Sequence, residues 1–363
     1  MTNPFKTVFR NTVIAAVAIV AIGLTAAAPA AQAAERTSFK LAWSIYVGWM
    51  PWGWAADTGI VDKWADRYGI DIEVVQFNDY IESINQYTAG AFDGVTATQM
   101  DALGIPSVGG VDTTALLIGD FSNGNDALIL KDGDAVEDVI GRNVNLVELS
   151  VSHYLLARAL ETIGKAERDV TVVNTSDADM IAAYQTDDVT AVVTWNPLVA
   201  EILSMPNATK VFDSSDIPGE IIDLTVVNSE TLADNPALGK ALAGAWYETM
   251  SIMMSDTEEG RAARAAMGKA SGTDLAGYDM QLASTKMFFD PAEAAAFGAS
   301  ADLKTTMDSV RTFLFDHGLL GDGAPSADVV GIEFADGTVM GDAANVKLRF
   351  TTRYMDMAAD GDL

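Results

Sequence analysis

Cysteine is absent from this chain of 363 residues, and basic residues are scarce. Without cysteine the chain can form no disulfide, thiolate metal site, iron–sulfur cluster or cysteine nucleophile. Asp and Glu number 51 against 22 Lys and Arg, the formal net charge is -29, and no basic run occurs. A nucleic-acid-binding surface needs clustered Lys and Arg, so we expect no nucleic acid as a partner. The acidity is typical of a solvated surface, and it would help to steer a cation without identifying one.

Histidine is almost as scarce, which limits the chemistry open to an enzyme. Only His153 and His317 are present. Ser152 precedes His153 directly, and neighbouring side chains on a helix point in different directions, so the two form no nucleophile–base dyad. The acidic stretch at 132–138 lacks the glycine and distal glutamate of a calcium loop and indicates a solvated turn. We predict that the protein is not an enzyme and has no catalytic residue, metal or cofactor.

Apolar runs are also short, and the longest lies near the N-terminus. Lys6 and Arg10 precede an apolar stretch at 13–24, which is too short to span a bilayer, and small residues follow at 31–33. This order predicts a secretory signal peptide at residues 1–33, cleaved after Ala33. The alternative is an uncleaved membrane anchor. Because no cysteine follows to carry a lipid, we expect the mature protein to be free in the periplasm.

The remaining chain alternates short apolar runs with helical patterns. Apolar runs are found at 39–46, 70–77, 94–98, 114–119, 127–130, 143–149, 170–173, 191–194 and 224–227. This alternation predicts an α/β fold in which each of two lobes is a mostly parallel sheet flanked by helices. The polar link at 120–125 and the run at 224–227 predict two crossings between the lobes, with hinges near Asn123 and Asp223. One lobe would comprise residues 34–123 plus 228–363, and the other residues 124–227.

Candidate ligand-binding residues follow from the strand ends. Ligands of open α/β sheets bind beyond the carboxyl ends of the strands. Four tryptophans and a tyrosine fall within residues 43–54, and carboxylates or hydroxyls follow other strands. The residues that we predict to bind the ligand are Trp43, Tyr46, Trp49, Trp52, Asp79, Asp101, Glu148, Ser150, Ser152, Trp195, Asn196 and Asp223.

Simpler roles stay open for several of these residues. The aromatic rings could pack the core, and Asp79, Asp101, Ser150 and Ser152 could serve only as helix caps. Glu148 differs, because a carboxylate near a strand end is costly to bury unless solvent or a cation meets it.

Three segments carry a resemblance to a known family. The sequences at 43–49, 150–160 and 193–197 resemble the nitrate/sulfonate/taurine group of ABC-transporter substrate-binding proteins, over about residues 40–254. They are most similar to the branch associated with urea carboxylase gene clusters. The resemblance implies a two-lobed periplasmic binding protein of type II that closes about a hinge. It also implies a small-molecule ligand, a membrane permease as partner and a role in nitrogen uptake, and we expect a monomer.

Charge at the expected cleft guides the choice of ligand. The resemblance implies that anion-binding members use a helix N-terminus such as the one at Ser150 and Ser152. Here Glu148, Asp79, Asp101 and Asp223 would repel an anion, which disfavours nitrate and sulfonates such as taurine. A planar guanidinium could pair with a carboxylate and stack on Trp or Tyr, so guanidine is favoured. Urea is next, with Ser150, Ser152 or Asn196 as donors to its carbonyl. An enzyme on the same fold is the remote alternative, although the related pyrimidine-forming enzymes rely on a cysteine-rich segment that this chain lacks.

Overall fold

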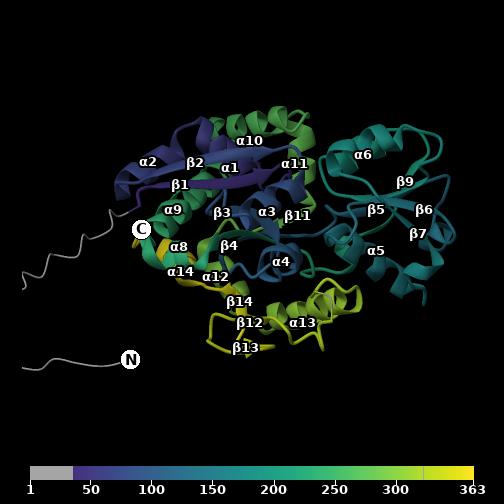
Figure 1. The fold of residues 1–363 in the computed structure, drawn as a ribbon. Coiled ribbons are helices and arrows are strands. Elements are labelled where there is room, and N and C mark those ends of the chain that lie inside the picture. The colour runs from purple at the N-terminus through teal and green to yellow at the C-terminus, as the bar shows by residue number, and fades with distance from the viewer. Residues whose placement is uncertain (1–35, 322) are drawn as a thin grey trace, which may run out of the picture. The chain divides into compact units, whose positions relative to one another are not determined.

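Two β-sheets, each with its own helices, organise the chain. The computed structural model of the protein describes residues 36–321 and 323–363, so the predicted signal peptide lies outside the described residues. We call the nine-stranded sheet and its helices the first lobe, and the five-stranded sheet and its helices the second lobe (Figure 1). This arrangement confirms the predicted α/β fold with two lobes. No helix in the described part of the chain is long and apolar enough to cross a membrane.

The first lobe contains the N-terminal and C-terminal parts of the described chain. Its strands run in the order β13-β12-β14-β4-β10-β3-β1-β2, and β11 pairs with β4. The strands are β1 (Ser38–Ser44), β2 (Asp71–Phe77), β3 (Gly94–Thr98), β4 (Thr113–Ser122), β10 (Ile222–Asn228), β11 (Thr285–Met287), β12 (Gly331–Glu333), β13 (Val339–Met340) and β14 (Val346–Phe350). The helices are α1 (Met50–Asp57), α2 (Ile60–Tyr68), α3 (Tyr80–Thr88), α4 (Gln99–Ala102), the π-helix η1 (Leu103–Ser107), α8 (Ser229–Asp234), α9 (Pro236–Met253), α10 (Glu258–Ala270), α11 (Leu275–Ala283), α12 (Pro291–Gly298), α13 (Ala301–Asp316) and α14 (Arg353–Asp360).

The second lobe repeats the strand order of the first on a smaller scale. Its order β7-β6-β8-β5-β9 matches β2-β1-β3-β10-β4 strand for strand. The strands are β5 (Ala127–Lys131), β6 (Asn143–Leu146), β7 (Thr171–Asn174), β8 (Ala191–Thr194) and β9 (Ala208–Asp213). The helices are α5 (Val151–Thr162), α6 (Asp177–Tyr184), α7 (Leu198–Leu203) and the short 3-10 helices η2 (Val136–Val139), η3 (Glu167–Asp169) and η4 (Ser214–Asp216).

The sheets are mixed rather than mostly parallel, which corrects the expectation from the sequence. In the first lobe β1 is parallel to β2 and β3, but β10 is antiparallel to both β3 and β4. In the second lobe β5 is antiparallel to β8 and β9. Strands β10 and β5 each follow a crossing, and a chain that enters from the other lobe can add to the sheet in the opposite direction.

The second crossing also differs from the expected one. Strand β10 pairs over its whole length with strands of the first lobe, so residues 222–227 belong to that lobe and the crossing lies before Ile222. Asp223 is therefore a strand residue and not a hinge. The late strands β9 and β11–β14 had no counterpart in the sequence pattern: β11, β12 and β13 have three residues or fewer, and β9 and β14 contain charged residues among their apolar ones.

Local sequence signals explain several element boundaries. α1 and α2 are separate helices, because Gly59 adopts φ 76° between them. Asp79 accepts the N–H of Glu82 at the start of α3, and Ser150 accepts that of Ser152 at the start of α5. Both helices thus begin at a cap beyond a strand end.

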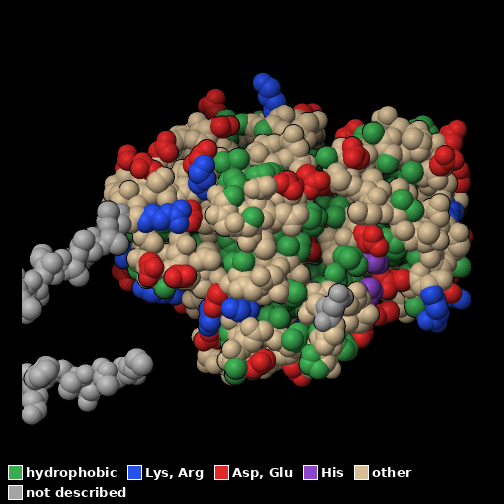
Figure 2. Space-filling view, viewed as in Figure 1, with side chains coloured by type: hydrophobic (Ala, Val, Ile, Leu, Met, Phe, Trp, Pro, Cys, Tyr) green, Lys and Arg blue, Asp and Glu red, His purple; other side chains and the backbone are tan. Residues whose placement is uncertain are grey.

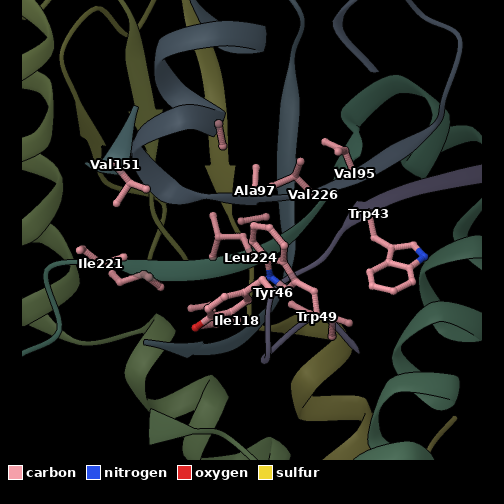
Figure 3. Packing of buried hydrophobic residues seen from close by; sticks show 14 of the residues in the cluster. Trp43, Tyr46, Trp49, Val95, Ala97, Ile118, Val151, Ile221, Leu224 and Val226 are labelled. Carbon is pink, nitrogen blue, oxygen red and sulfur yellow. The ribbon is translucent and has the colours of Figure 1, made fainter. Parts of the chain in front are cut away.

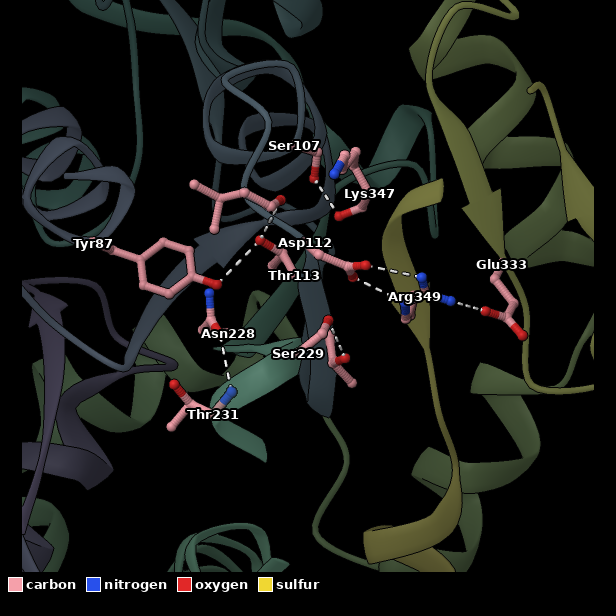
Figure 4. A network of polar contacts seen from close by, with 12 residues as sticks. Tyr87, Ser107, Asp112, Thr113, Asn228, Ser229, Thr231, Glu333, Lys347 and Arg349 are labelled. Atoms are coloured by element: carbon pink, nitrogen blue, oxygen red, sulfur yellow. Dashed lines mark hydrogen bonds and ion pairs between the residues drawn. The ribbon is translucent and has the colours of Figure 1, made fainter. Parts of the chain in front are cut away.

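An ion-pair network fastens the C-terminal strands to the first sheet. Arg349 in β14 donates to both carboxylate oxygens of Asp112 at 2.8 Å and also pairs with Glu333 (Figure 4). Nearby, the buried phenol of Tyr87 lies 3.0 Å from the hydroxyl of Thr113. These contacts hold β14 against β4, far along the strand from the crossing.

Candidate functional site

A small pocket lies where the carboxyl ends of the strands of both lobes meet. Its cavity volume is about 10 Å³, room for about one water molecule. The first lobe contributes Tyr46, Trp49, Tyr80, Thr98 and Asp223, and the second lobe with the crossing segments contributes Asp126, Val151, Trp195 and Ile221. Figure 3 shows Tyr46 and Trp49 together in the core cluster, with Ile221 and Val151 to one side of them. This position between the lobes makes the pocket the candidate ligand site.

Aromatic rings form one wall of the pocket. Trp49 lies 4.9 Å from Tyr46 and 5.5 Å from Tyr80, measured between ring centroids. Trp195 of the second lobe meets Tyr80 edge-on at 5.6 Å. The indole Nε1 of Trp49 is buried and has no hydrogen-bond partner. The wall therefore offers π-faces and one free N–H donor.

A pair of buried carboxyl groups lies beside the pocket, and Asp223 of this pair lines it. Asp120 and Asp223 are direct partners on the neighbouring antiparallel strands β4 and β10, and they are 0% and 2% exposed. Tyr46 donates to Oδ1 of Asp120 at 2.7 Å, the two carboxyl groups share a hydrogen bond with each other, and no other described group donates to Oδ2 of either aspartate. Like charges on directly opposed residues repel each other. Burial raises the pKa of Asp120 to about 7, and burial with the charges of Asp120 and Asp126 raises the pKa of Asp223.

A third carboxyl group comes from the first crossing. Asp126 is 3% exposed, and its Oδ2 accepts the hydroxyl of Ser122 at 2.5 Å. Burial raises its pKa to about 7, and the charge of Asp101 contributes. None of the described residues that line the pocket is Lys, Arg or His. A cation with several N–H donors would supply what these three carboxyl groups lack.

Asp101 lies behind the wall and covers the helix N-terminus at Val151. Its Oδ2 accepts the phenol of Tyr80 at 2.7 Å and the hydroxyl of Thr98 at 2.9 Å. Burial raises its pKa to about 6, while hydrogen bonds from Tyr80, Thr98 and the backbone N–H of Val151 act in the opposite direction. The first turn of α5 thus already faces an anionic group of the protein itself.

The structure brings only part of the predicted site together. Tyr46, Trp49, Trp195 and Asp223 line the pocket, and Asp101 lies directly behind it. Trp43 and Trp52 belong to the core instead. Trp43 packs against Gly53, and Figure 3 shows it apart from Tyr46 and Trp49. Trp52 is 0% exposed, and its Nε1 donates to Thr225 at 3.1 Å.

The other predicted residues lie outside the pocket. Asp79 only caps α3, and Ser150 caps α5 while donating to the carbonyl of Val147. Ser152 is buried in α5, and its hydroxyl has no partner. The amide of Asn196 is engaged with Ser284 and the N–H of Ala200.

Glu148 is a correction to the sequence analysis. It is exposed and lies two residues beyond the end of β6, where only its backbone N–H is bonded, to Asn174. Because β6 ends at Leu146 rather than at residue 149, the carboxylate falls in a surface turn. It needs no cationic partner there, since water solvates it.

Sequence reasoning missed several residues of the site. They are Tyr80, Thr98, Asp120, Asp126, Val151 and Ile221. A sequence signal was available for Asp120 and Asp126. They lie on either side of residues 121–125 and adjoin the apolar runs of β4 and β5. An ionisable residue at the end of a buried strand is unusual and marks a candidate site.

A second polar cluster lies away from the pocket. His153 in α5 and His317 after α13 both contact Glu167 in η3, and His317 does so at 2.5 Å. Figure 2 shows histidine atoms in purple beside acidic side chains in red. The ligand atoms of these three residues lie within 4.8 Å of one another, a spacing that could hold a metal. However, Nδ1 of His153 accepts the N–H of Leu149 at 3.1 Å, which leaves the proton on Nε2 facing Glu167. The cluster is therefore best described as two imidazole donors on one carboxylate.

Comparisons with known proteins agree with this architecture. The model of the NMT1-like family matches residues 16–267. The taurine-binding periplasmic protein of Escherichia coli (strain K12) is 28% identical over 132 residues, which are 35% of this chain and 40% of that protein. The chain thus aligns with about two fifths of the length of this curated relative.

Solved structures of low sequence identity share the fold. The alkanesulfonate-binding protein of Xanthomonas axonopodis pv. citri, bound to MOPS, has a TM-score of 0.64 at 17% identity and covers 80% of this chain and 96% of its own. The periplasmic nitrate-binding protein of Synechocystis PCC 6803 has a TM-score of 0.57 at 14% identity and covers 90% of this chain and 98% of its own.

Proposed function

Because the chain belongs to the NMT1-like family, we propose that it is the extracytoplasmic solute-binding component of an ABC importer. In this role it captures a small solute between its lobes in the periplasm, delivers it to a membrane permease and catalyses no reaction. The shared fold with sulfonate- and nitrate-binding proteins supports this assignment.

We further propose that the solute is nitrogen-rich and cationic, with guanidinium favoured. The observation that carries this choice is the group of buried carboxyls Asp120, Asp126 and Asp223. Two of its oxygens receive no hydrogen bond from any described group other than the carboxyls themselves, and none of the described residues that line the pocket is basic. Guanidinium offers N–H donors in a planar fork and carries the charge that balances ionised carboxylates. Its flat faces also match the rings of Tyr46, Trp49 and Tyr80.

Charge argues against the ligands of the anion-binding relatives. An anion would face Asp126 and Asp223 in the pocket lining, and the N-terminus of α5 that could receive it is covered by Asp101. Desolvating like charges together costs several kcal/mol (about 2–5).

Urea is the second candidate, and one observation favours it. The indole N–H of Trp49 is buried without a partner, and a carbonyl oxygen would satisfy it. Protonated Asp120 or Asp223 could likewise donate to that oxygen. Guanidinium has no acceptor to offer to either group.

Calorimetric titration at two pH values tests the proposal. Ionisation of Asp126 and Asp120, with pKa values of about 7, should make guanidinium binding tighter at pH 8 than at pH 6. Urea carries no charge, so its affinity should fall or stay constant over this range. Taurine and nitrate should give no heat at either pH. Tight taurine or nitrate binding without a response to guanidinium or urea would refute the proposed solute class.

A further inference from the structure

The backbone of Tyr80 forms a link between the lobes beside the pocket. Tyr80 is the first residue of α3, and its N–H donates to Oδ1 of Asp177 at 3.2 Å. Asp177 is the first residue of α6 in the second lobe and is 8% exposed. A carboxylate of the second lobe therefore meets the N-terminus of a helix in the first lobe.

The side chain of Tyr80 forms part of a second link. Its phenol oxygen accepts the N–H of Thr98 at 3.0 Å and donates to Asp101 at 2.7 Å. Asp101 in turn lies close enough to the N–H of Val151, in the first turn of α5, for that group to lower its pKa. A carboxylate of the first lobe thus meets the N-terminus of a helix in the second lobe, and the hydrogen-bond chain runs through Tyr80.

The ring of Tyr80 joins these two links to the pocket. It lines the pocket and contacts Trp49 of the first lobe and Trp195 of the second. Tyr80 is 1% exposed, so its ring cannot move without disturbing these neighbours. Tyr80 therefore lines the pocket, contacts residues of both lobes, and takes part in both carboxylate–helix contacts.

We propose that Tyr80 is a positioning residue that couples the content of the pocket to closure of the two lobes. This inference rests on the proposed function, since a captured solute is what the ring of Tyr80 contacts. When the lobes separate, the N–H groups of Tyr80 and Val151 lose Asp177 and Asp101. A solute that holds the ring in place restores both contacts at once. In the closed state the N–H groups at both helix N-termini face the protein's own carboxylates. An anionic solute therefore finds neither of these helix N-termini free.

Tyr80→Phe tests the proposal, with Tyr87→Phe as a matched control. Both tyrosines lie in α3, both are buried, and both phenols are hydrogen-bonded, but Tyr87 bonds Thr113 away from the pocket. Because the chain has no cysteine, single cysteines introduced at the exposed positions Asp66 and Asp188, one on each lobe, can carry a fluorescence donor and acceptor. The distance between the dyes then reports closure in the full mature chain.

Guanidinium chloride is the probe for the first measurement. We expect Tyr80→Phe to need at least about tenfold more guanidinium than Tyr87→Phe for half closure, a difference of about 1.4 kcal/mol. Tyr87→Phe should close at the concentration of the parent protein while losing similar thermal stability. Equal midpoints for the two variants, within about twofold, would overturn the proposal.

Amide hydrogen exchange supplies a measurement that needs no solute. We expect the N–H of Val151 to exchange at least about fivefold faster in Tyr80→Phe than in Tyr87→Phe, because Asp101 loses the phenol that positions it. Asp177→Asn should accelerate exchange at Tyr80 in the same way. If the parent protein ignores guanidinium and urea but these amides respond as expected, the proposed solute is wrong and the role of Tyr80 stands. Unchanged exchange at Val151 would overturn that role whatever the solute.

Discussion

Replacing Asp223 by Asn should separate a cationic solute from a neutral one. The side chain lines the pocket, is 2% exposed and has one oxygen to which no described group other than Asp120 hydrogen-bonds. If the solute is guanidinium, the substitution removes a charge-assisted contact and should weaken binding by about 2–5 kcal/mol, or at least about thirtyfold. If it is urea, the amide can still accept a hydrogen bond, and the loss should be about 1 kcal/mol.

The same substitution should change the pH dependence of stability in the free protein. Burial raises the pKa of Asp120 from 3.8 to about 7, which corresponds to roughly 4 kcal/mol against the charged form. Between these pH values the folded state binds more protons than the unfolded state, so stability falls as the pH rises. Asp223→Asn removes a second carboxyl group whose pKa is raised by burial and by the charges of Asp120 and Asp126, so this fall should become smaller.

Calorimetry with both solutes and thermal unfolding between pH 5 and pH 8 measure these effects. Glu148→Gln is the matched control, because it neutralises an exposed carboxylate outside the pocket and should change neither affinity by more than about twofold. Guanidinium affinity that is as strong in Asp223→Asn as in Glu148→Gln would refute the role of the carboxyl pair.

Three further changes test other parts of the structure. Trp49→Phe removes the unpartnered indole N–H, so urea affinity should fall several-fold more than guanidinium affinity in the same titrations. Glu167→Gln removes the carboxylate whose hydrogen bond raises the pKa of His317. The substitution should cost about 1–2 kcal/mol of stability near pH 6, and the cost should shrink as the pH rises through the pKa of His317. Equal losses of stability at pH 6 and pH 9 in thermal unfolding would contradict this. Gly48→Ala would place a methyl group 2.4 Å from Oδ2 of Asp120, so melting temperature and solute affinity should both drop, and unchanged values would show that the loop can move away.

The order of short apolar runs and helical patterns was enough to predict an α/β fold with two lobes. Runs such as 94–98 and 191–194 coincide with strands β3 and β8, in which every residue is buried and the polar residues are threonines. The same reading placed Tyr46 and Trp49 in the loop after β1, where the pocket is found. Local signals also gave the caps at Asp79 and Ser150, since a cap contacts residues only two or three positions away.

Contacts between distant segments decided the chemistry of the site. The sequence alone favoured Glu148 as the important carboxylate, but the early end of β6 leaves it in water. Asp120 and Asp223 are 103 positions apart in the sequence, and only the antiparallel entry of β10 beside β4 makes them direct neighbours. Burial then raises the pKa values of both aspartates, because an environment of low polarity and nearby like charges disfavour the ionised form. Sequence periodicity reports which face of an element is apolar, whereas the partner of a buried charge depends on the register between strands that pair only after the chain has crossed twice.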